Sequence, residues 1–220
     1  MFTLPNPPGF SGLDPDREIH LHRRHLPHWR QDGATYFVTF RTADSIPASK
    51  VRELLLMKRE LEVAPQDRRR HLAAAWDEFM KLMERFLDEG HGTCPLRASE
   101  LSAVVADAMH HFDGERYSLF AYAVMPNHVH SLLRPLGDYG LSAILKSWKS
   151  FSGRTVNEKL GQQGKLWQAE SYDRIIRDGE ELHRVVQYIG KNGEKAGLGE
   201  GSFRRWVCPE WEWHGWGFVG

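Results

Sequence analysis

Two histidines one residue apart interrupt an apolar stretch near the middle of the chain. The segment "LFAYAVMPNHVHSLLRP" contains His128 and His130, with Val129 between them. Because a strand turns successive side chains to opposite faces, the two imidazoles share one face and Val129 lies on the other. Two neutral imidazoles side by side can bind one divalent metal ion. On spacing alone, histidines that merely pack inside a strand are the more common alternative.

A tyrosine and an asparagine four residues apart occupy one flank of the last predicted helix. The segment "DGEELHRVVQYIGKNG" predicts a helix that begins with a capping box at Asp178 and ends at Gly193. Its apolar residues follow i, i+3, i+4, i+7 spacing, and Tyr188 and Asn192 are neighbours beside that stripe. Arg184 continues the same row. Without further context, a half-buried structural tyrosine is the ordinary alternative.

If this flank faces the histidine side of a sheet, two imidazoles, a carboxamide oxygen and a phenol converge. The histidines and the Asn192 oxygen would make a mixed nitrogen and oxygen site for Mg²⁺ or Mn²⁺, with positions left for phosphate oxygens. Such an ion polarises a phosphodiester. Tyrosine, whose reference pKa is about 10, is a poor nucleophile until a metal and cations activate it. Tyr172 is the other candidate nucleophile, but it lies in a predicted strand and lacks an amide four residues later.

The elements that position these residues follow a mixed order of strands and helices. The sequence patterns predict strands over 34–42, 116–126, 128–135 and within 166–178, and helices over 44–63, 68–90, 97–112, 140–160 and 178–193. Because strands do not strictly alternate with helices, we expect an α+β fold: an antiparallel sheet with helices on one face. The segment 44–112 is expected as a helical insertion in a single domain that covers 23–220.

Both ends of the chain have unusual compositions. Clustered Pro and Gly predict a flexible N-terminal arm over 1–22. The tail, 203–220, is rich in tryptophan, and indoles can stack on unpaired bases or cover an apolar face. Glu210 and Glu212 would repel phosphate, so packing is the favoured interpretation.

The overall composition indicates a soluble globular protein. Its 29 Lys and Arg residues balance 29 Asp and Glu residues, which argues against a surface coated in positive charge but leaves room for a local basic face. No window reaches the roughly 18 uninterrupted apolar residues of a membrane span, and the start lacks the layout of a secretory signal. Cys94 and Cys208 are isolated, as in a reduced cytoplasmic protein.

Several cations are candidates for phosphate contacts. Lys146 and Lys149 share the polar face of the helix over 140–160, and Arg154 follows them. A solvated helix face is an equal alternative for all three. Trp167 and Arg174 can either line a nucleic-acid channel or pack structurally.

Ordered blocks of the sequence resemble a known family. "HVH", followed by a helix carrying "YIGKN", is similar to the single-tyrosine HUH transposases, in which U is a bulky apolar residue. Four blocks resemble the branch of REP-associated tyrosine transposases: "PHWRQDGATYFVTFR", "YAVMPNHVHSLL", "ILKSWKSF" and "LWQAESYDRIIRDGEELHRVVQYIGKN". The resemblance extends from about residue 23 to about residue 200.

The resemblance implies a ferredoxin-like or RRM-like sheet with the histidine pair on a central strand. It assigns His128, His130 and Asn192 as ligands of Mg²⁺ or Mn²⁺ and Tyr188 as the nucleophile. The candidate DNA contacts, taken from the residues themselves, are Lys146, Lys149, Arg154, Arg174 and Arg184. The implied substrate is single-stranded DNA with a hairpin or palindromic repeat. Cleavage would leave a 5′-phosphotyrosine and a free 3′-hydroxyl. A monomer or homodimer in the cytoplasm, associated with the bacterial nucleoid, is expected.

The sequence differs from the family pattern in two places, and two other functions are alternatives to this interpretation. Relatives commonly carry an Asn-Pro-x-Lys stretch after the tyrosine, whereas Gly193 stands at the proline position here, and the helical segment 44–112 is long for the family. A domesticated protein that binds hairpin DNA without cutting is one alternative. A metal-dependent hydrolase that activates water is the other, although no H-x-H-x-D-H or H-E-x-x-H pattern accompanies the pair.

Overall fold

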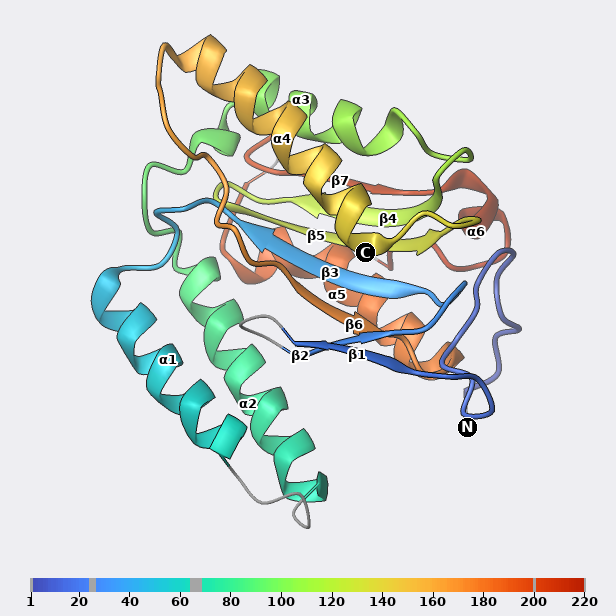
Figure 1. The fold of residues 1–220 in the computed structure, drawn as a ribbon. Helices are drawn as coiled ribbons and strands as arrows, with labels where there is room; N and C mark the ends of the chain where they lie inside the picture. Colours follow the sequence, from blue (N-terminus) through green and yellow to red (C-terminus); the bar gives the residue numbers. More distant parts are fainter. Residues whose placement is uncertain (1, 24–26, 64–68, 200, 220) are drawn as a thin grey trace.

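A five-stranded antiparallel sheet organises the chain, of which the computed structural model describes residues 2–23, 27–63, 69–199 and 201–219 (Figure 1). The strand order is β6-β3-β5-β4-β7. The strands are β3 (Tyr36–Arg41), β4 (Tyr117–Val124), β5 (His128–Pro135), β6 (Tyr172–Ile175) and β7 (Arg204–Val207). A separate hairpin consists of β1 (His20–Arg23) and β2 (Pro27–Arg30). The predicted α+β class and antiparallel sheet are confirmed, and the strand with the histidine pair is central.

A tight turn at Pro126 and Asn127 joins the two central strands. The backbone N–H of Met125 donates to the carbonyl of His128 at 2.8 Å, and Val124 pairs with Val129 directly beyond it. Pro and Asn are typical turn residues because one fixes φ and the other tolerates unusual backbone angles. The turn therefore places His128 at the start of β5.

Helices cover both faces of the sheet, which corrects the expectation of helices on one face. The first face carries α3 (Ser99–His110) and α4 (Leu141–Leu160), and the second carries α5 (Gly179–Lys195). The central strands are apolar on both sides: Val129 and Leu133 face the first layer, and Leu132 faces the second. Strands buried on both faces need a cover on each.

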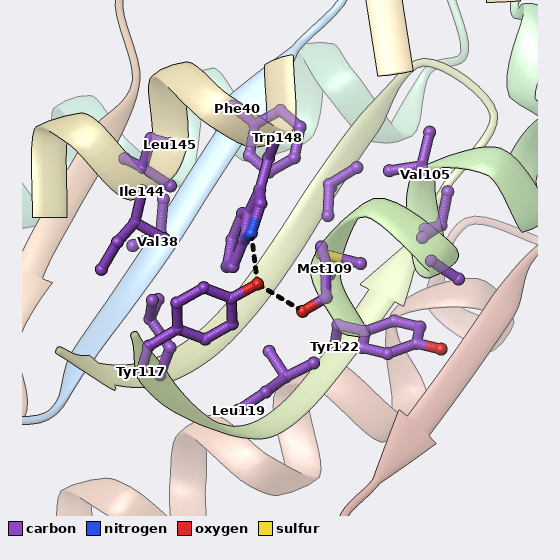
Figure 2. Packing of buried hydrophobic residues seen from close by; sticks show 14 of the residues in the cluster. Val38, Phe40, Val105, Met109, Tyr117, Leu119, Tyr122, Ile144, Leu145 and Trp148 are labelled. Atoms are coloured by element: carbon purple, nitrogen blue, oxygen red, sulfur yellow. Dashed lines mark hydrogen bonds between the residues drawn. The ribbon is translucent and has the colours of Figure 1, made fainter. Parts of the chain in front are cut away.

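An aromatic contact fixes the first layer (Figure 2). The indole Nε1 of Trp148 on α4 donates to the hydroxyl of Tyr117 on β4 at 2.8 Å, and that hydroxyl donates to the carbonyl of Met109 on α3 at 2.7 Å. All three residues are at most 1% exposed. One buried chain of hydrogen bonds thus joins two helices to the sheet, and no polar atom in it lacks a partner.

The segment 44–112 divides between two structural roles. The helices α1 (Ala48–Val63) and α2 (Arg69–Asp88) form a hairpin beside the sheet, with a small core of its own that includes Phe79, Met83 and Phe86. After a 3-10 turn over Pro95–Arg97, α3 packs into the main core instead. Only the first two helices of the predicted insertion therefore have a core of their own.

The chain ends pack against each other, so the expected flexible arm is seated on the domain. The indoles of Trp211 and Trp216 donate to the carbonyls of Pro8 and Pro5 at 2.9 and 3.0 Å. Both tryptophans are fully buried, which confirms packing as the role of these two indoles. Trp213, on the short helix α6 (Pro209–Trp213), is 82% exposed.

The tyrosine helix α5 starts as predicted but ends later. Asp178 caps it by accepting from the N–H of Glu181 at 2.8 Å. The helix continues through Gly193 to Lys195. A Cβ at Gly193 would lie 2.2 Å from the ring of Phe203, so glycine serves close packing here and is not a helix terminator. No helix among the described residues is long and apolar enough to cross a membrane.

Candidate active site at the histidine pair

The two histidines face each other on the side of the sheet covered by α5. Their Nε2 atoms are 3.1 Å apart, and their rings meet at 77° with centroids 4.7 Å apart. His128 is 1% exposed and His130 is 0% exposed. The strand alternation that placed both imidazoles on one face is confirmed, and two ring nitrogens point to a common position.

Each histidine is held through its other ring nitrogen. Asn127 Oδ1 lies 2.8 Å from Nδ1 of His128, and Thr39 Oγ1 lies 2.8 Å from Nδ1 of His130. Thr39 on β3 pairs in register with His130 on β5, so the sheet itself delivers this contact. Partners of this kind orient a histidine toward a metal and fix its tautomer. Sequence reasoning found neither Asn127 nor Thr39.

Burial keeps both imidazoles neutral at ordinary pH. It lowers the pKa of His128 to about 3. It also lowers the pKa of His130 well below its ordinary value, and the neighbouring His128 and Lys195 act in the same direction. A neutral imidazole offers a nitrogen lone pair, which is the form that binds a metal ion.

Tyr188 reaches the histidine pair from α5. Its hydroxyl lies 3.3 Å from Nε2 of His130, and the two rings meet edge to face with centroids 5.1 Å apart. Phe37 stacks on His130 with centroids 5.5 Å apart and also meets the Tyr188 ring edge to face at 6.0 Å. The predicted meeting of the tyrosine flank with the histidines is therefore present within one chain. Tyr172, the other candidate nucleophile, is partly buried between the second face of the sheet and the α1–α2 hairpin.

Asn192 supplies a buried amide beside the phenol. The residue is 0% exposed, and neither its Oδ1 nor its Nδ2 has a hydrogen bond of ordinary geometry among the described residues. The amide also acts on the Tyr188 hydroxyl, where it lowers the pKa of the phenol and so opposes the effect of burial. A buried amide without partners is costly unless a ligand satisfies it.

These donors fit a divalent ion. Two nitrogens bound about 2.1 Å from one ion and at right angles lie about 3 Å apart, which agrees with the observed separation of the Nε2 atoms. The unpartnered Asn192 oxygen is a suitable third ligand for Mg²⁺ or Mn²⁺. Among the described residues, no group of three His, Cys, Asp or Glu side chains could hold a metal ion, so a third protein ligand beside the two histidines would have to be of another kind, such as this amide.

Charged residues that sequence reasoning missed surround the phenol. Burial raises the pKa of Tyr188 well above its ordinary value, and Glu84 and Asp88 on α2 add to this effect. Burial likewise raises the pKa of Asp88 to about 6 and the pKa of Glu84, while Lys195 acts in the opposite direction on both. The ammonium of Lys195 lies 4.9 Å from the centre of the Tyr188 ring. Only Lys195 had a sequence signal, since it follows Tyr188 by seven residues, two helical turns.

The predicted arginines of this side of the sheet are already paired. Arg174 forms an ion pair with buried Glu181, and its guanidinium lies 5.5 Å from the centre of the Phe37 ring. It is thus one aromatic ring away from His130. Arg184 pairs with Glu180 at 2.9 Å on the exposed side of α5 and does not continue the row toward the histidines.

The remaining predicted cations line a groove elsewhere. An open groove of about 1230 Å³ between α4 and the segment 164–171 includes Lys146, Lys149 and Arg154, but none of the four residues at the histidine site. Lys149 donates to the carbonyl of Ala169 at 2.8 Å, and burial lowers its pKa to about 8. Trp167 also lines this groove, although it is only 5% exposed and donates to Ser152 Oγ at 3.0 Å.

The comparison with family models agrees with the resemblance. Residues 98–192 match the family model of the IS200-like transposases, a segment that contains both histidines, Tyr188 and Asn192. The predicted resemblance to the single-tyrosine transposases is thereby confirmed over that segment. A solved structure of the REP-associated tyrosine transposase bound to a REP hairpin is similar at 16% identity and a TM-score of 0.47, covering 80% of this chain and 77% of that chain. No curated protein sequence matches the chain.

Proposed function

From the match of residues 98–192 to the IS200-like transposases, we propose that the chain cleaves and rejoins single-stranded DNA. The proposed enzyme is metal-dependent, acts on hairpin or palindromic repeat DNA as a REP-associated tyrosine transposase, and forms a 5′-phosphotyrosine. One observation supports this most: the Tyr188 hydroxyl lies beside two neutral histidines whose ring nitrogens face each other.

In the proposed reaction, the Tyr188 oxygen attacks a phosphorus of the bound strand. A bond forms between that oxygen and phosphorus, and the bond from phosphorus to the 3′-oxygen breaks. The phenolic proton passes to the Glu84 carboxylate, which contacts the hydroxyl, and the departing 3′-oxygen takes a proton from water. Joining reverses these steps with a second 3′-hydroxyl.

The residues around the phenol have distinct roles in this proposal. His128, His130 and Asn192 would hold Mg²⁺ or Mn²⁺, which stabilises the charge that develops on the phosphate oxygens. Lys195, beside the Tyr188 ring, favours the phenolate and a nearby phosphate. The contact between Tyr188 and His130 of the same chain supports attack by residues of a single subunit.

The groove lined by Lys146, Lys149 and Arg154 is the proposed place for the DNA hairpin. The groove lies on the α4 side of the sheet, whereas Tyr188 lies on the α5 side. A strand bound to both would pass the β6 edge, where Arg174 is located. Phosphate contacts in the groove would hold the substrate, and the histidine site would carry out the chemistry.

A denaturing gel tests this function. Labelled hairpin DNA from repeats near the gene is incubated with the protein and Mg²⁺ or Mn²⁺, beside Tyr188→Phe and Tyr172→Phe. We expect a slowly migrating covalent adduct with the unmodified protein and with Tyr172→Phe, and none with Tyr188→Phe. The Tyr172 variant is the matched control because it also removes one phenolic hydroxyl from the side of the sheet that faces α5.

Other outcomes identify the alternatives. Cleavage without an adduct, unchanged by Tyr188→Phe, would replace the tyrosine mechanism with metal-dependent hydrolysis. Tight binding of the hairpin with neither cleavage nor adduct would indicate a binding protein that has lost the reaction. Binding itself should persist in Tyr188→Phe, because only one hydroxyl group is removed.

A further inference from the structure

The side chain of Asn127 uses both ends of its amide inside the protein. Asn127 is 1% exposed and occupies the turn between β4 and β5. Its Oδ1 lies 2.8 Å from Nδ1 of His128. Its Nδ2 donates to the carbonyl of His91 at 3.0 Å and to the carbonyl of Leu87 at 3.4 Å. One carboxamide therefore joins a histidine of the site to the C-terminal end of α2.

These contacts determine which way the amide points and which nitrogen of His128 carries the proton. Backbone carbonyls only accept hydrogen bonds, so the NH₂ group of Asn127 must face Leu87 and His91. The amide oxygen then faces His128, and an amide oxygen also only accepts. Nδ1 of His128 must therefore be the protonated nitrogen, and its Nε2 presents a lone pair toward His130.

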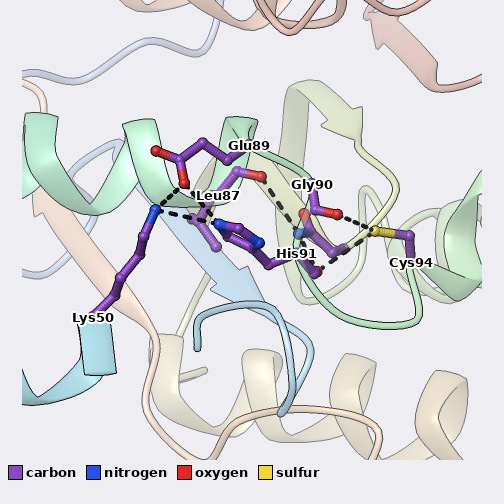
Figure 3. A network of polar contacts seen from close by, with 7 residues as sticks. Lys50, Leu87, Glu89, Gly90, His91 and Cys94 are labelled. Carbon is purple, nitrogen blue, oxygen red and sulfur yellow. Dashed lines mark hydrogen bonds and ion pairs between the residues drawn. The ribbon is translucent and has the colours of Figure 1, made fainter. Parts of the chain in front are cut away.

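The surrounding backbone holds the turn firmly in place. The carbonyl of Asn127 accepts from the N–H of Thr42 at 2.8 Å, and the carbonyl of Pro126 accepts from the N–H of Leu96 at 3.1 Å. On the α2 side, Figure 3 shows a polar network in which Glu89 bonds both Lys50 and His91, at 2.7 Å to the latter. The Asn127 side chain thus lies between two fixed segments.

We propose that Asn127 is a positioning residue: it holds His128 in the tautomer that offers Nε2 to a metal ion, and it ties that histidine to the α1–α2 hairpin. The first role, control of the His128 tautomer, can be tested without a metal ion. Its importance for catalysis rests on the proposed function, in which His128 binds the metal. The second role makes the end of α2 and the histidine pair one connected unit.

The tautomer can be measured without metal or DNA. Long-range ¹H–¹⁵N NMR of the histidine rings at pH 7.5 distinguishes Nδ1–H from Nε2–H in His128, which is neutral at this pH. We expect Nδ1–H in the unmodified protein and in the control Asn157→Ala, whose amide donates to the Gly164 carbonyl on the surface. Asn127→Ala should lose the single tautomer. An Nε2–H signal in the unmodified protein, or an unchanged Nδ1–H signal in Asn127→Ala, would overturn the proposal.

A second variant, Asn127→Asp, separates control of the His128 tautomer from the tie to the α1–α2 hairpin. It also replaces the alanine variant in the test if that variant does not fold. A carboxylate still accepts from Nδ1 but cannot donate to the two carbonyls. We therefore expect the Nδ1–H tautomer to persist while backbone amides of residues 87–94 exchange with solvent at least about tenfold faster. Unchanged exchange would disprove the tie to the hairpin.

Direct titration with Mn²⁺ distinguishes failure of the positioning role of Asn127 from failure of the proposed metal site. Loss of an outer partner of a metal-binding histidine weakens metal affinity by about 10- to 100-fold, and we expect this for Asn127→Ala. Equal affinity of Asn127→Ala and the unmodified protein would overturn the positioning role. If the unmodified protein binds no Mn²⁺, the proposed metal site fails, whereas the NMR result still decides the role of Asn127.

Discussion

The hydroxyl of Tyr188 lies 3.3 Å from Nε2 of His130, although 58 residues separate the two in the chain. The contact requires that α5 cover the face of β5 from which the histidines project. It also means that the phenol and a metal ion would use the same ring nitrogen. A metal ion bound to His130 would occupy the lone pair of this nitrogen. The remaining neighbours of the phenol would then be Glu84, Asn192 and Lys195.

Replacing the histidine pair should abolish metal-dependent cleavage. The double variant His128→Ala, His130→Ala lacks two of the three proposed ligands. Loss of a residue that only contacts a ligand weakens metal affinity by up to about 100-fold. Loss of both ligands should therefore weaken Mn²⁺ binding by more than this. Calorimetric titration measures the affinity, and the denaturing gel measures cleavage. The control is His214→Ala, an exposed histidine of the tail. Cleavage by the double variant at the original rate would exclude the pair from the chemistry.

Mn²⁺ affinity should be nearly independent of pH between 7.5 and 6.0. Protons compete with a metal for imidazole only near the pKa of the ring, and burial places the pKa of His128 near 3 and lowers that of His130 as well. Both histidines thus stay neutral through this range. Two ordinary histidines with a pKa of about 6.5 would lose roughly tenfold or more in affinity over it. Titration at four pH values checks the slope, and a loss of that size would indicate exposed imidazoles.

Local periodicity explains why much of the site could be predicted. Strand alternation places His128 and His130 together, and helical spacing makes Tyr188 and Asn192 neighbours. The sequence carries no comparable signal for Glu84 and Asp88, because their place at Tyr188 depends on where the α1–α2 hairpin packs. Long-range packing of this kind is not encoded in any single segment.

The errors have the same origin. Gly193 was expected to end a helix, but the residue that decides its role, Phe203, comes ten positions later and packs on it. The N-terminal arm was expected to be flexible from its Pro and Gly content, but its backbone carbonyls accept from Trp211 and Trp216. In each case a tertiary contact outweighs the local preference of the segment.

Removing the charge of Asp88 should stabilise the protein in a pH-dependent way. Burial raises the pKa of Asp88 to about 6, above the value near 3.8 of the unfolded chain. The folded state therefore binds the extra proton, and its stability falls as pH rises from about 4 to above 6. Asp88→Asn should be more stable than the unmodified protein at pH 8, by about 1 kcal/mol after allowance for partial exposure. At pH 4 the difference should be close to zero.

Urea unfolding at both pH values measures this effect. Glu89→Gln is a suitable control, because hydrogen bonds from Lys50 and His91 lower the pKa of that exposed carboxyl. Its removal should not stabilise the protein at pH 8. Equal stability of Asp88→Asn and the unmodified protein at pH 8 would mean that water or a cation already compensates the charge of Asp88.

Lys146 should contribute to the salt dependence of DNA binding. It is exposed in the groove along α4, so a phosphate contact there would be released by salt. Lys146→Ala should weaken hairpin binding and reduce the slope of log affinity against log salt concentration by about 1. Lys159→Ala is the matched control on the same helix, outside the residues that line the groove. Equal slopes for the two variants would place the hairpin elsewhere.

Gly193→Ala should destabilise the protein, and the effect should change sign when Phe203 is made smaller. A methyl group at Gly193 would lie 2.2 Å from the Phe203 ring, and overpacking of this kind costs about 1–3 kcal/mol. In an open helix interior the same change is favourable by about 0.8–1.0 kcal/mol. In a Phe203→Ala background, Gly193→Ala should therefore stabilise the protein. Urea unfolding of the unmodified protein, the two single variants and the double variant completes the double-mutant cycle. A stabilising effect of Gly193→Ala alone would show that the ring moves aside and that glycine is not required after Asn192.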